Sequence, residues 1–545
     1  DAGHPFPFIS NLSKSVGVCL KRPGQKGKYF ARVKLPPEID QWIELKSNSN
    51  FMHRYINIEE IIQHNIKDLF PGMTILSSVI FRVTRDATMD EDDDHLIENV
   101  LEWVTEGLKE RKFSPVVRLE IDNPDSEWLI RFLKSGLEVV DEQVFAMPSL
   151  ICYSSFSNII DLNIPELRFN KFQGQNYLPF ENIDNDSRIF NEISKKDHLI
   201  HLPYQTYLST VESFLVAASQ DSKVRAIKII LYRTDADGRL IDILLSAVER
   251  GIQVAVIIEL KARFDEASNI KWAHKLEDAG IHVSYGTSMY KTHAKMIMVV
   301  RQEAKKLKTY VNIGTGNFNG QTSKHYTDLS LFTCRKPIVE EVVNVFNYLT
   351  GRCLEGAYKK LLVAPFNMSR RFIQHINNEG KNALQGKPAE IIAKMNQLED
   401  PFIIDALYKA SQDGVKITLL IRGFCCLKPG VKGLSENIKV VSLIGRLLEH
   451  TRIFYFRNAA PVSAGGIFYI GSADWMSRNL HARIEVITPI LSQEMKDKLL
   501  NILEITLKDN QNVWELTSKG MYNRRQNDKR KFIAQEWFIE NKKEL

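Results

Sequence analysis

Along this chain, short runs of apolar residues alternate with stretches in which apolar residues recur at helical spacing. The apolar runs at 296–300 and 453–456 have the length and composition of strands buried on both faces. The stretches at 241–250 and 401–413 each predict a helix that is closed by a glycine. Strands and helices in this order predict α/β domains with mixed sheets.

The same order of elements occurs twice, and the spacing matches. His293 precedes the first apolar run, and Gly314 follows the next predicted strand 314 − 293 = 21 positions later. His450 and Gly471 bracket the second copy, again 471 − 450 = 21 positions apart. Such repetition indicates two copies of one domain. Two halves of this kind can face each other across a cleft, so that both imidazoles point at one substrate.

The first copy carries residues suited to phosphoryl chemistry. His293 and Lys295 are two positions apart, which places both side chains on one side of a strand. The Gly-Thr-Gly-Asn sequence at 314–317 predicts a turn whose backbone N–H groups can approach an anion. A single His beside a strand is more often only a hydrogen-bonded polar group. The duplication is therefore what favours a functional site.

Basic residues also occur at the ends of predicted strands in both halves. They are Arg233, Arg263, Lys394 and Arg422. Ligands of α/β sheets gather at the carboxyl ends of strands, and the guanidinium fork matches phosphate oxygens. Each residue alone is better explained by an ion pair with Asp265, Glu266 or Glu449. Their recurrence in two halves favours a clamp for a polyanion.

Composition narrows the class of protein only slightly. The 545 residues are enough for three or four domains, and the net charge of +6 suits an anionic substrate without establishing one. No apolar run approaches the roughly 20 residues of a membrane span, and no signal peptide is predicted. Six scattered cysteines favour a reducing cytoplasm. Because the chain begins at Asp1 rather than Met, we expect a fragment or a processed protein.

The pattern predicts five segments. They are an α+β head domain at 1–165, a linker at 166–195, catalytic α/β domains at 196–355 and 356–510, and a charged tail at 511–545. In the head domain, Arg82 and Arg85 could contact phosphate, although a solvated strand face is the simpler interpretation. In the second catalytic domain we expect a helix that ends at Gly380. The tail could be a solvated or partner-binding helix, and we expect no chemistry from it.

The paired motifs resemble the signature of the phospholipase D superfamily, in which two repeats each contribute a His. His293 to Asn317 spans 317 − 293 = 24 positions, and His450 to Asp474 spans 474 − 450 = 24. The resemblance implies two tandem phospholipase D-like domains. The superfamily's Asp is replaced by Val300, and the second copy has Arg in place of Lys and Asp in place of Asn. These departures argue against phosphodiester hydrolysis.

Longer strings resemble the bacterial polyphosphate kinase family over nearly the whole chain. They include IKIILYRT, KTHAKMIMVV, NIGTGNFN, GRLLEHTRIFYF and YIGSADWMSRNLHARIEV. The family usually has a further helical domain before the sequence HPFPF, and we expect that domain to be absent here. The resemblance implies an ATP:polyphosphate phosphotransferase that passes the terminal phosphate of ATP reversibly to a polyphosphate chain.

The resemblance also implies roles for individual residues. His293 is implied to be the phosphohistidine, and His450 its partner in contact with ATP. Lys295 would stabilise the transferring group electrostatically. Tyr326 and Arg422 match positions that contact the nucleotide.

A Mg²⁺ ion is the implied cofactor. Arg233 and Arg263 match positions assigned to the metal site. Because a guanidinium group has no lone pair to offer a metal, we expect both to bind phosphates that carry Mg²⁺.

The implied partners are ATP, ADP and inorganic polyphosphate, with no nucleic acid. We expect a homodimer or homotetramer in the cytoplasm, with peripheral membrane association as an option. Two other classes stay open: a phospholipase D-like enzyme acting on lipid or nucleic-acid phosphodiesters, and a non-enzymatic polyanion-binding module.

Overall fold

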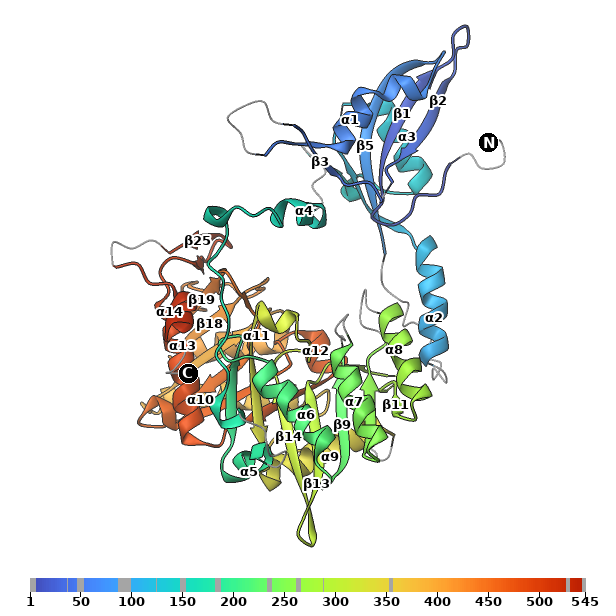
Figure 1. Ribbon diagram of the computed structural model, residues 1–545. Helices are drawn as coiled ribbons and strands as arrows, with labels where there is room; N and C mark the ends of the chain where they lie inside the picture. The colour runs from blue at the N-terminus through green and yellow to red at the C-terminus, as the bar shows by residue number, and fades with distance from the viewer. Residues whose placement is uncertain are drawn as a thin grey trace. The chain divides into compact units, whose positions relative to one another are not determined.

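The computed structural model describes twelve stretches of the chain. They are residues 6–36, 38–46, 53–86, 100–123, 125–147, 153–181, 188–232, 238–260, 266–287, 289–351, 356–525 and 530–541. By its internal contacts the chain divides into two compact units, Asp1–His95 with Glu102–Asn170, and Leu96–Leu101 with Lys171–Leu545 (Figure 1).

The smaller unit is an α+β domain built on a sheet of order β2-β1-β5-β6-β7. The strands are β1 (Lys14–Lys21), β2 (Lys28–Lys34), β5 (Thr74–Arg85), β6 (Val116–Ile121) and β7 (Val144–Ala146). Helix α3 (Glu127–Leu137) buries three leucines at four-residue intervals against one face. Helix α1 (Ile58–His64) and the turn after it pack on the other face. The unit also contains β3 (Trp42–Glu44), β4 (Tyr55–Asn57), α2 (Val100–Glu110) and α4 (Ser157–Ile160).

Two arginines of β5 are held by contacts within the smaller unit. Arg82 forms an ion pair with Glu120 at 2.5 Å. Arg85 donates to the main-chain oxygens of Ser114 at 2.7 Å and Ile9 at 3.0 Å. These contacts support a structural role for both arginines rather than phosphate binding.

The first half of the larger unit contains a mixed sheet of order β11-β10-β9-β13-β14-β15, with β8 paired to β15. Its strands are β8 (His198–Leu202), β9 (Val224–Leu231), β10 (Gln253–Ile258), β11 (His282–Ser284), β13 (Met296–Glu303), β14 (Lys306–Gly314) and β15 (Tyr326–Thr333). Strands β9, β10 and β11 are parallel, and the pairs from β9 through β13, β14 and β15 to β8 are antiparallel. The helices are α5 (Arg188–Lys195), α6 (Ser213–Gln220), α7 (Arg239–Glu249), α8 (Glu266–Asp278) and α9 (Lys336–Leu349).

The second half repeats this arrangement. Strands β17, β18 and β19 are parallel, and β21, β22 and β23 continue the sheet in antiparallel order from β17. The strands are β16 (Leu362–Ala364), β17 (Glu390–Met395), β18 (Lys416–Ile421), β19 (Ile438–Leu443), β21 (Ile453–Phe456), β22 (Ile467–Gly471), β23 (Arg483–Pro489), β24 (Val513–Leu516) and β25 (Tyr522–Arg524). The helices are α10 (Met368–Leu384), α11 (Pro401–Gln412), α12 (Ser477–His481), α13 (Gln493–Lys508) and α14 (Ala534–Glu540). The predicted class, an α+β domain followed by α/β halves with mixed sheets, is confirmed.

The two halves exchange short strands. Strand β12 (Lys291–Thr292) belongs to the first half in sequence but pairs with β23 of the second. Strand β20 (Leu448–Glu449) of the second half pairs in turn with β15 of the first. The two strands are 448 − 291 = 157 positions apart, the same offset as the two histidines. Each histidine therefore follows directly on a strand that crosses into the other half.

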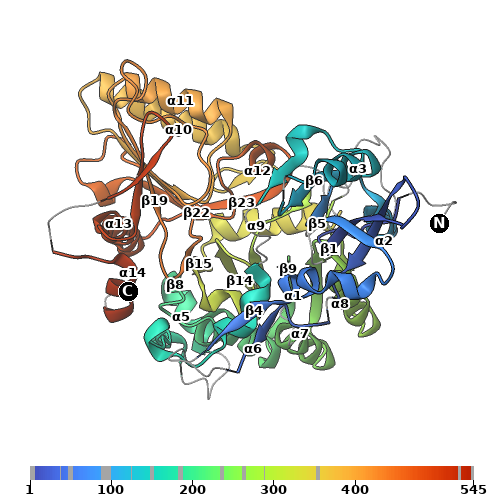
Figure 2. The ribbon, with the colours of Figure 1, turned by 90° about the horizontal axis from the view of Figure 1, so that it is seen from above.

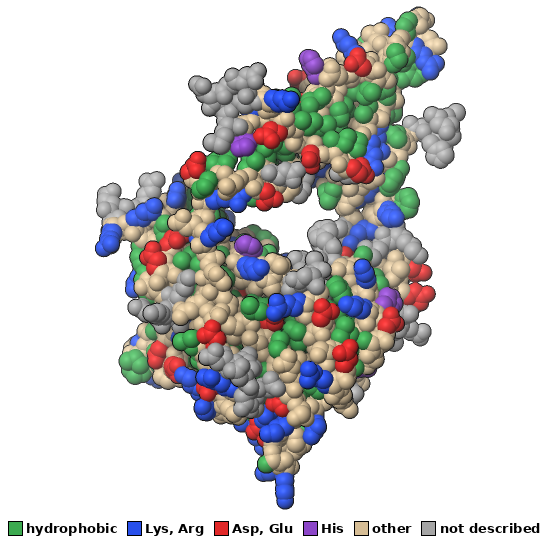
Figure 3. All heavy atoms as spheres, in the orientation of Figure 1, with side chains coloured by type: hydrophobic (Ala, Val, Ile, Leu, Met, Phe, Trp, Pro, Cys, Tyr) green, Lys and Arg blue, Asp and Glu red, His purple; other side chains and the backbone are tan. Residues whose placement is uncertain are grey.

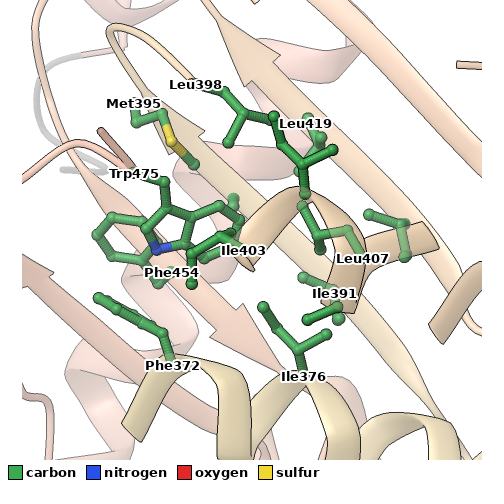
Figure 4. Packing of buried hydrophobic residues seen from close by; sticks show 14 of the residues in the cluster. Phe372, Ile376, Ile391, Met395, Leu398, Ile403, Leu407, Leu419, Phe454 and Trp475 are labelled. Atoms are coloured by element: carbon green, nitrogen blue, oxygen red, sulfur yellow. The ribbon is translucent and has the colours of Figure 1, made fainter. Parts of the chain in front are cut away.

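Helices α10 and α11 lie side by side over the second sheet and close a large apolar core (Figure 2). Figure 4 shows Phe372 and Ile376 of one helix and Ile403 and Leu407 of the other pointing toward the strands and Trp475. Each aliphatic side chain buried in this way stabilises the fold by about 1.5–3 kcal/mol.

The two halves also share a core. One apolar cluster combines Met296 and Ile313 of the first half with Ile484 and Val486 of the second. Because their apolar side chains pack together, the halves form one compact unit, and residues at their junction have fixed relative positions.

The predicted end of a helix at Gly380 is wrong. Helix α10 continues through Gly380 to Leu384. A Cβ at position 380 would lie 2.6 Å from Oδ2 of Asp413, just beyond the end of α11. The glycine thus lies where the residue after α11 approaches α10 closely, and it does not mark a change of chain direction.

Candidate functional site at the junction of the halves

Both repeated histidines lie at the junction of the two halves. The backbone N–H groups of His293 and Ala294 both donate to the carbonyl oxygen of Ile484, at 2.8 and 3.0 Å. The N–H of His450 donates to Oγ1 of Thr327 at 3.2 Å. The exchanged strands thus anchor the main chain of each histidine on the opposite half.

Each imidazole is also oriented by a carboxylate of the opposite half. Nδ1 of His293 lies 2.9 Å from Oε2 and 2.8 Å from Oε1 of Glu485, on β23. Nδ1 of His450 lies 2.8 Å from Oδ1 of Asp328, on β15. When Nδ1 donates its proton to the carboxylate, Nε2 keeps its lone pair and is free to act as a nucleophile.

The surroundings of His293 favour its uncharged form. Burial lowers its pKa well below 6.5, and the positive charges of Lys295, Arg483 and Arg452 lower it further. The charge of His450 contributes in the same direction. A neutral imidazole at neutral pH can attack phosphorus without a separate strong base.

Lys295, two residues after His293, has a buried amino group. Its side chain is 2% exposed, and Nζ has no hydrogen-bond partner among the described residues. It lies 4.4 Å from the centre of the Tyr232 ring. Burial lowers the pKa of Lys295 well below 10.5. Because a buried donor without an acceptor is costly, an incoming anion would be bound strongly here.

The second copy differs at the equivalent position, which is occupied by Arg452. Its Nε and Nη2 donate to the two carboxylate oxygens of Asp474 at 3.2 and 3.3 Å. Its Nη1 donates to the main-chain oxygen of Thr315 at 3.0 Å and lies 3.1 Å from Nε2 of His450. The amino group beside His293 therefore has no hydrogen-bond partner among the described residues, whereas the guanidinium beside His450 is already engaged.

The glycine-rich turn of the first copy packs tightly on the carboxylate that orients His450. Oγ1 of Thr315 donates to Oδ1 of Asp328 at 2.6 Å. A Cβ at Gly316 would lie 2.1 Å from Oδ2 of the same carboxylate. The turn thus needs glycine at 316 so that Asp328 can reach His450.

Tyr326 lies against the ring of His450, and Arg422 contacts the main chain of the residue before it. The Tyr326 ring centre is 5.3 Å from that of His450. Arg422 donates from Nε to the carbonyl oxygen of Glu449 at 2.8 Å and from Nη2 to Oδ1 of Asn396 at 2.7 Å. A pocket is lined by Tyr326, His450 and three residues of the turn, Gly314, Gly316 and Asn317, together with apolar side chains of the first half.

The geometry can now be compared with known proteins. The polyphosphate kinase of Synechocystis sp. is 42% identical to this chain over 542 residues, which cover 96% of the chain and 74% of that protein. The chain belongs to the polyphosphate kinase family. Family models describe residues 1–159 as the polyphosphate kinase middle domain, 188–355 as C-terminal domain 1 and 361–535 as C-terminal domain 2.

Further comparisons agree with membership of the family. Polyphosphate kinase 1 of Chlorobaculum tepidum is 39% identical over 549 residues, covering 99% of the chain and 77% of that protein. The crystal structure of polyphosphate kinase from Porphyromonas gingivalis superposes with a TM-score of 0.83 at 28% identity, covering 99% of this chain and 79% of that one.

The structure bears on two of the four basic residues that the sequence predicts to form a clamp for a polyanion. Lys394 is buried and forms an ion pair with Glu449 at 2.8 Å, so its charge is already matched and the expectation that it binds a polyanion is wrong. Arg233 and Arg263 lie outside the described residues. Both Lys394 and Arg422 contact the residue next to His450, Lys394 through the side chain of Glu449 and Arg422 through its main-chain oxygen.

On the face seen in Figure 3, Lys and Arg side chains of the larger unit are interspersed with Asp and Glu, so charge on this face does not single out a binding site. None of the described helices is long and apolar enough to cross a membrane.

Sequence reasoning missed Glu485, Asp328 and Arg483. A signal for the two carboxylates was present, because each follows the histidine of its own copy at the same distance. Asp328 comes 328 − 293 = 35 positions after His293, and Glu485 comes 485 − 450 = 35 positions after His450. Arg483 has no counterpart of this kind, and its effect on His293 becomes visible only when β12 and β23 are paired.

Proposed function

We propose that this chain transfers the terminal phosphate of ATP reversibly to inorganic polyphosphate, with His293 as the covalent intermediate. One observation carries the proposal: the His293 imidazole is held at Nδ1 by Glu485, and the buried amino group of Lys295, two residues along the chain, has no hydrogen-bond partner among the described residues. This arrangement supplies a nucleophile and an anion-binding group side by side, as phosphoryl transfer requires.

In the first step, the Nε2 lone pair of His293 attacks the γ-phosphorus of ATP. The N–P bond forms as the bond between phosphorus and the bridging oxygen breaks, and ADP leaves with that electron pair. In the second step, a terminal oxygen of polyphosphate attacks the same phosphorus and the N–P bond breaks. The reverse sequence makes ATP, because the bonds exchanged in the two directions are similar in kind.

Catalysis in such a reaction rests on positioning and on charge stabilisation, because the transition state is loose and rich in negative charge. Lys295 would contact an oxygen of the transferring group, and Arg483 would add positive potential. Tyr326 and Arg422 would contact the nucleotide. His450 would donate from Nε2 to the leaving oxygen in its imidazolium form, which the Asp328 carboxylate stabilises while burial lowers its pKa.

Mg²⁺ fits this scheme as an ion carried by the phosphates. Among the described residues, no three His, Cys, Asp or Glu side chains converge as a metal site. Arg233 and Arg263 would then hold the phosphates to which Mg²⁺ is bound. When bound, the ion would neutralise charge on the phosphate oxygens.

The segment boundaries, the homo-oligomer, the cytoplasmic location and peripheral membrane association stay predictions. Each needs its own measurement.

The proposal is tested with ATP labelled at the γ-phosphate. We expect acid-labile, alkali-stable label on the wild-type protein and none on His293→Ala. A matched control is His282→Ala, because His282 is an exposed histidine of the same half. Label retained by His293→Ala would contradict the proposed intermediate, and cleavage of phosphodiesters without label would support a phospholipase D-like enzyme instead.

A further inference from the structure

The residue before His450 is fixed from several directions. Glu449 accepts at Oε2 from Nζ of Lys394 at 2.8 Å and from Oγ1 of Thr327 at 3.1 Å. Its main-chain oxygen accepts from Nε of Arg422 at 2.8 Å. Because Thr327 also accepts from the N–H of His450, these contacts set the position of the His450 backbone.

The remaining side of Glu449 is closed by Gln535, from the C-terminal helix α14. Nε2 of Gln535 donates to Oε1 of Glu449 at 2.6 Å and to the carbonyl oxygen of Leu447 at 2.9 Å. Its Oε1 accepts from the N–H of Leu447 at 2.9 Å. The side-chain amide thus pairs with the main chain just before β20, as a neighbouring strand would, and it also holds the carboxylate of Glu449.

The fit around Gln535 is close. The residue is 1% exposed. A Cβ at Gly445 would lie 2.5 Å from Oε1 of Gln535, so the loop that leads to β20 comes near only because residue 445 is glycine. A buried amide with both of its polar atoms satisfied has little freedom to move.

Helix α14 is itself firmly attached to the larger unit. The N–H of Ala534, next to Gln535, donates to Oδ2 of the buried Asp509 at 2.8 Å. On the far side, the Phe538 ring packs against His201 and Tyr204, with ring centres 5.2 and 5.1 Å apart. Gln535 therefore presents its amide from a rigid support.

We infer that Gln535 is a positioning residue of the phosphotransferase site, which acts by holding the segment 447–449 and hence His450 and Arg422 in place. The inference rests on the role proposed above for His450. It assigns a part in the reaction to the C-terminal segment, from which the sequence led us to expect no chemistry.

The first test replaces Gln535 by Leu, which keeps the size of the side chain and removes all three hydrogen bonds. We expect kcat for polyphosphate synthesis to fall by about 10- to 100-fold, because a small displacement of an aligned group is enough to do so. The matched control is Glu540→Gln, because Glu540 is an exposed residue of the same helix. It should leave kcat and Tm nearly unchanged.

The second test, Gln535→Glu, gives a signature that a purely structural role would not produce. At low pH a proton shared between the new carboxyl and Glu449 restores the lost donor, and as pH rises both carboxylates ionise and repel each other. Lys394 and Arg422 contact Glu449, and the charge of Glu449 raises the pKa of Tyr204. We expect the ratio of the variant's kcat to that of the wild type to fall as pH rises, at a temperature well below Tm.

The outcomes separate the two proposals. If His293→Ala abolishes the phosphoenzyme while Gln535→Leu and Gln535→Glu keep wild-type kcat at every pH, the positioning role is overturned and the phosphohistidine stands. If His293→Ala keeps the label, the proposed function itself fails. If Gln535→Leu does not fold, the pH dependence of Gln535→Glu decides, and a flat ratio overturns the inference.

Discussion

His293 and Glu485 are 192 positions apart in the chain, yet Nδ1 of the histidine lies 2.9 Å from Oε2 of the carboxylate. The contact joins the two halves of the larger unit, and the pair of His450 and Asp328 repeats it in the opposite direction. A nucleophile in one half is thus oriented by the other. The site exists only when both halves are folded and docked.

Replacing Glu485 by Gln should slow formation of the phosphoenzyme by about 10- to 100-fold, the usual effect of losing a partner that orients a functional histidine. The amide oxygen can still accept from Nδ1, but the negative charge that favours this tautomer is gone. Single-turnover transfer from labelled ATP measures the rate. Wild-type speed in this variant would show that Glu485 does not orient His293.

The pH dependence of the reaction should also reflect the ionisation of the Glu485 carboxyl group. Burial raises the pKa of Glu485 to about 7, although Arg483 and Lys295 oppose the shift. Below that pH its carboxyl proton can be donated to Nδ1, so that the imidazole proton lies on Nε2 and blocks attack. Phosphoenzyme formation should therefore accelerate as pH rises through about 7, and Glu485→Gln should abolish this step in the profile.

The stability of the folded protein should fall with rising pH over the range in which phosphoenzyme formation accelerates. Because the folded pKa is raised above 4.5, the folded protein binds this proton more tightly than the unfolded chain does. The contribution of Glu485 is fully present below pH 4.5 and is lost as pH rises through about 7. We expect the Tm of Glu485→Gln, relative to the wild type, to increase with pH across this window. A constant difference would contradict the assigned shift.

Much of this fold could be predicted because its strands are fully buried. The runs at 296–300 and 453–456 are apolar on both faces, and the structure places β13 and β21 there. The duplication was visible because the histidines, the glycine turns and the intervening loops keep constant spacing. These signals are local or periodic, and neither kind depends on knowing which segments pack together.

The rest of the site depends on contacts between distant segments. Strands β12 and β20 have two residues each, too few to produce a periodic pattern. Lys394 was expected to bind phosphate because the recurrence of basic residues in two halves outweighed the alternative ion pair with Glu449, and only the structure shows that this ion pair forms. Gln535 is a polar residue in a charged tail, and its importance follows only from the loop against which α14 packs.

Gly316→Ala should damage the site through Asp328. The new Cβ would lie 2.1 Å from Oδ2 of this carboxylate and would force it away from His450. Overpacking of this kind costs about 1–3 kcal/mol of unfolding free energy. Denaturation with urea measures the loss, and turnover should fall with it. Gly356→Ala is the control, because its nearest neighbour is at an ordinary 3.5 Å; equal behaviour of the two variants would refute the packing argument.

Lys295→Met should separate activity from stability. The native amino group is buried and has no hydrogen-bond partner among the described residues, so removing it relieves an unfavourable burial and should leave Tm unchanged or higher. Phosphoenzyme formation should fall by about 100- to 1,000-fold, the usual effect of losing one group that stabilises developing negative charge. Lys306→Met, an exposed lysine of the same half, is the control and should change neither quantity. If Lys295→Met instead lowers Tm and leaves the rate intact, Lys295 supports the fold rather than the transferring phosphate.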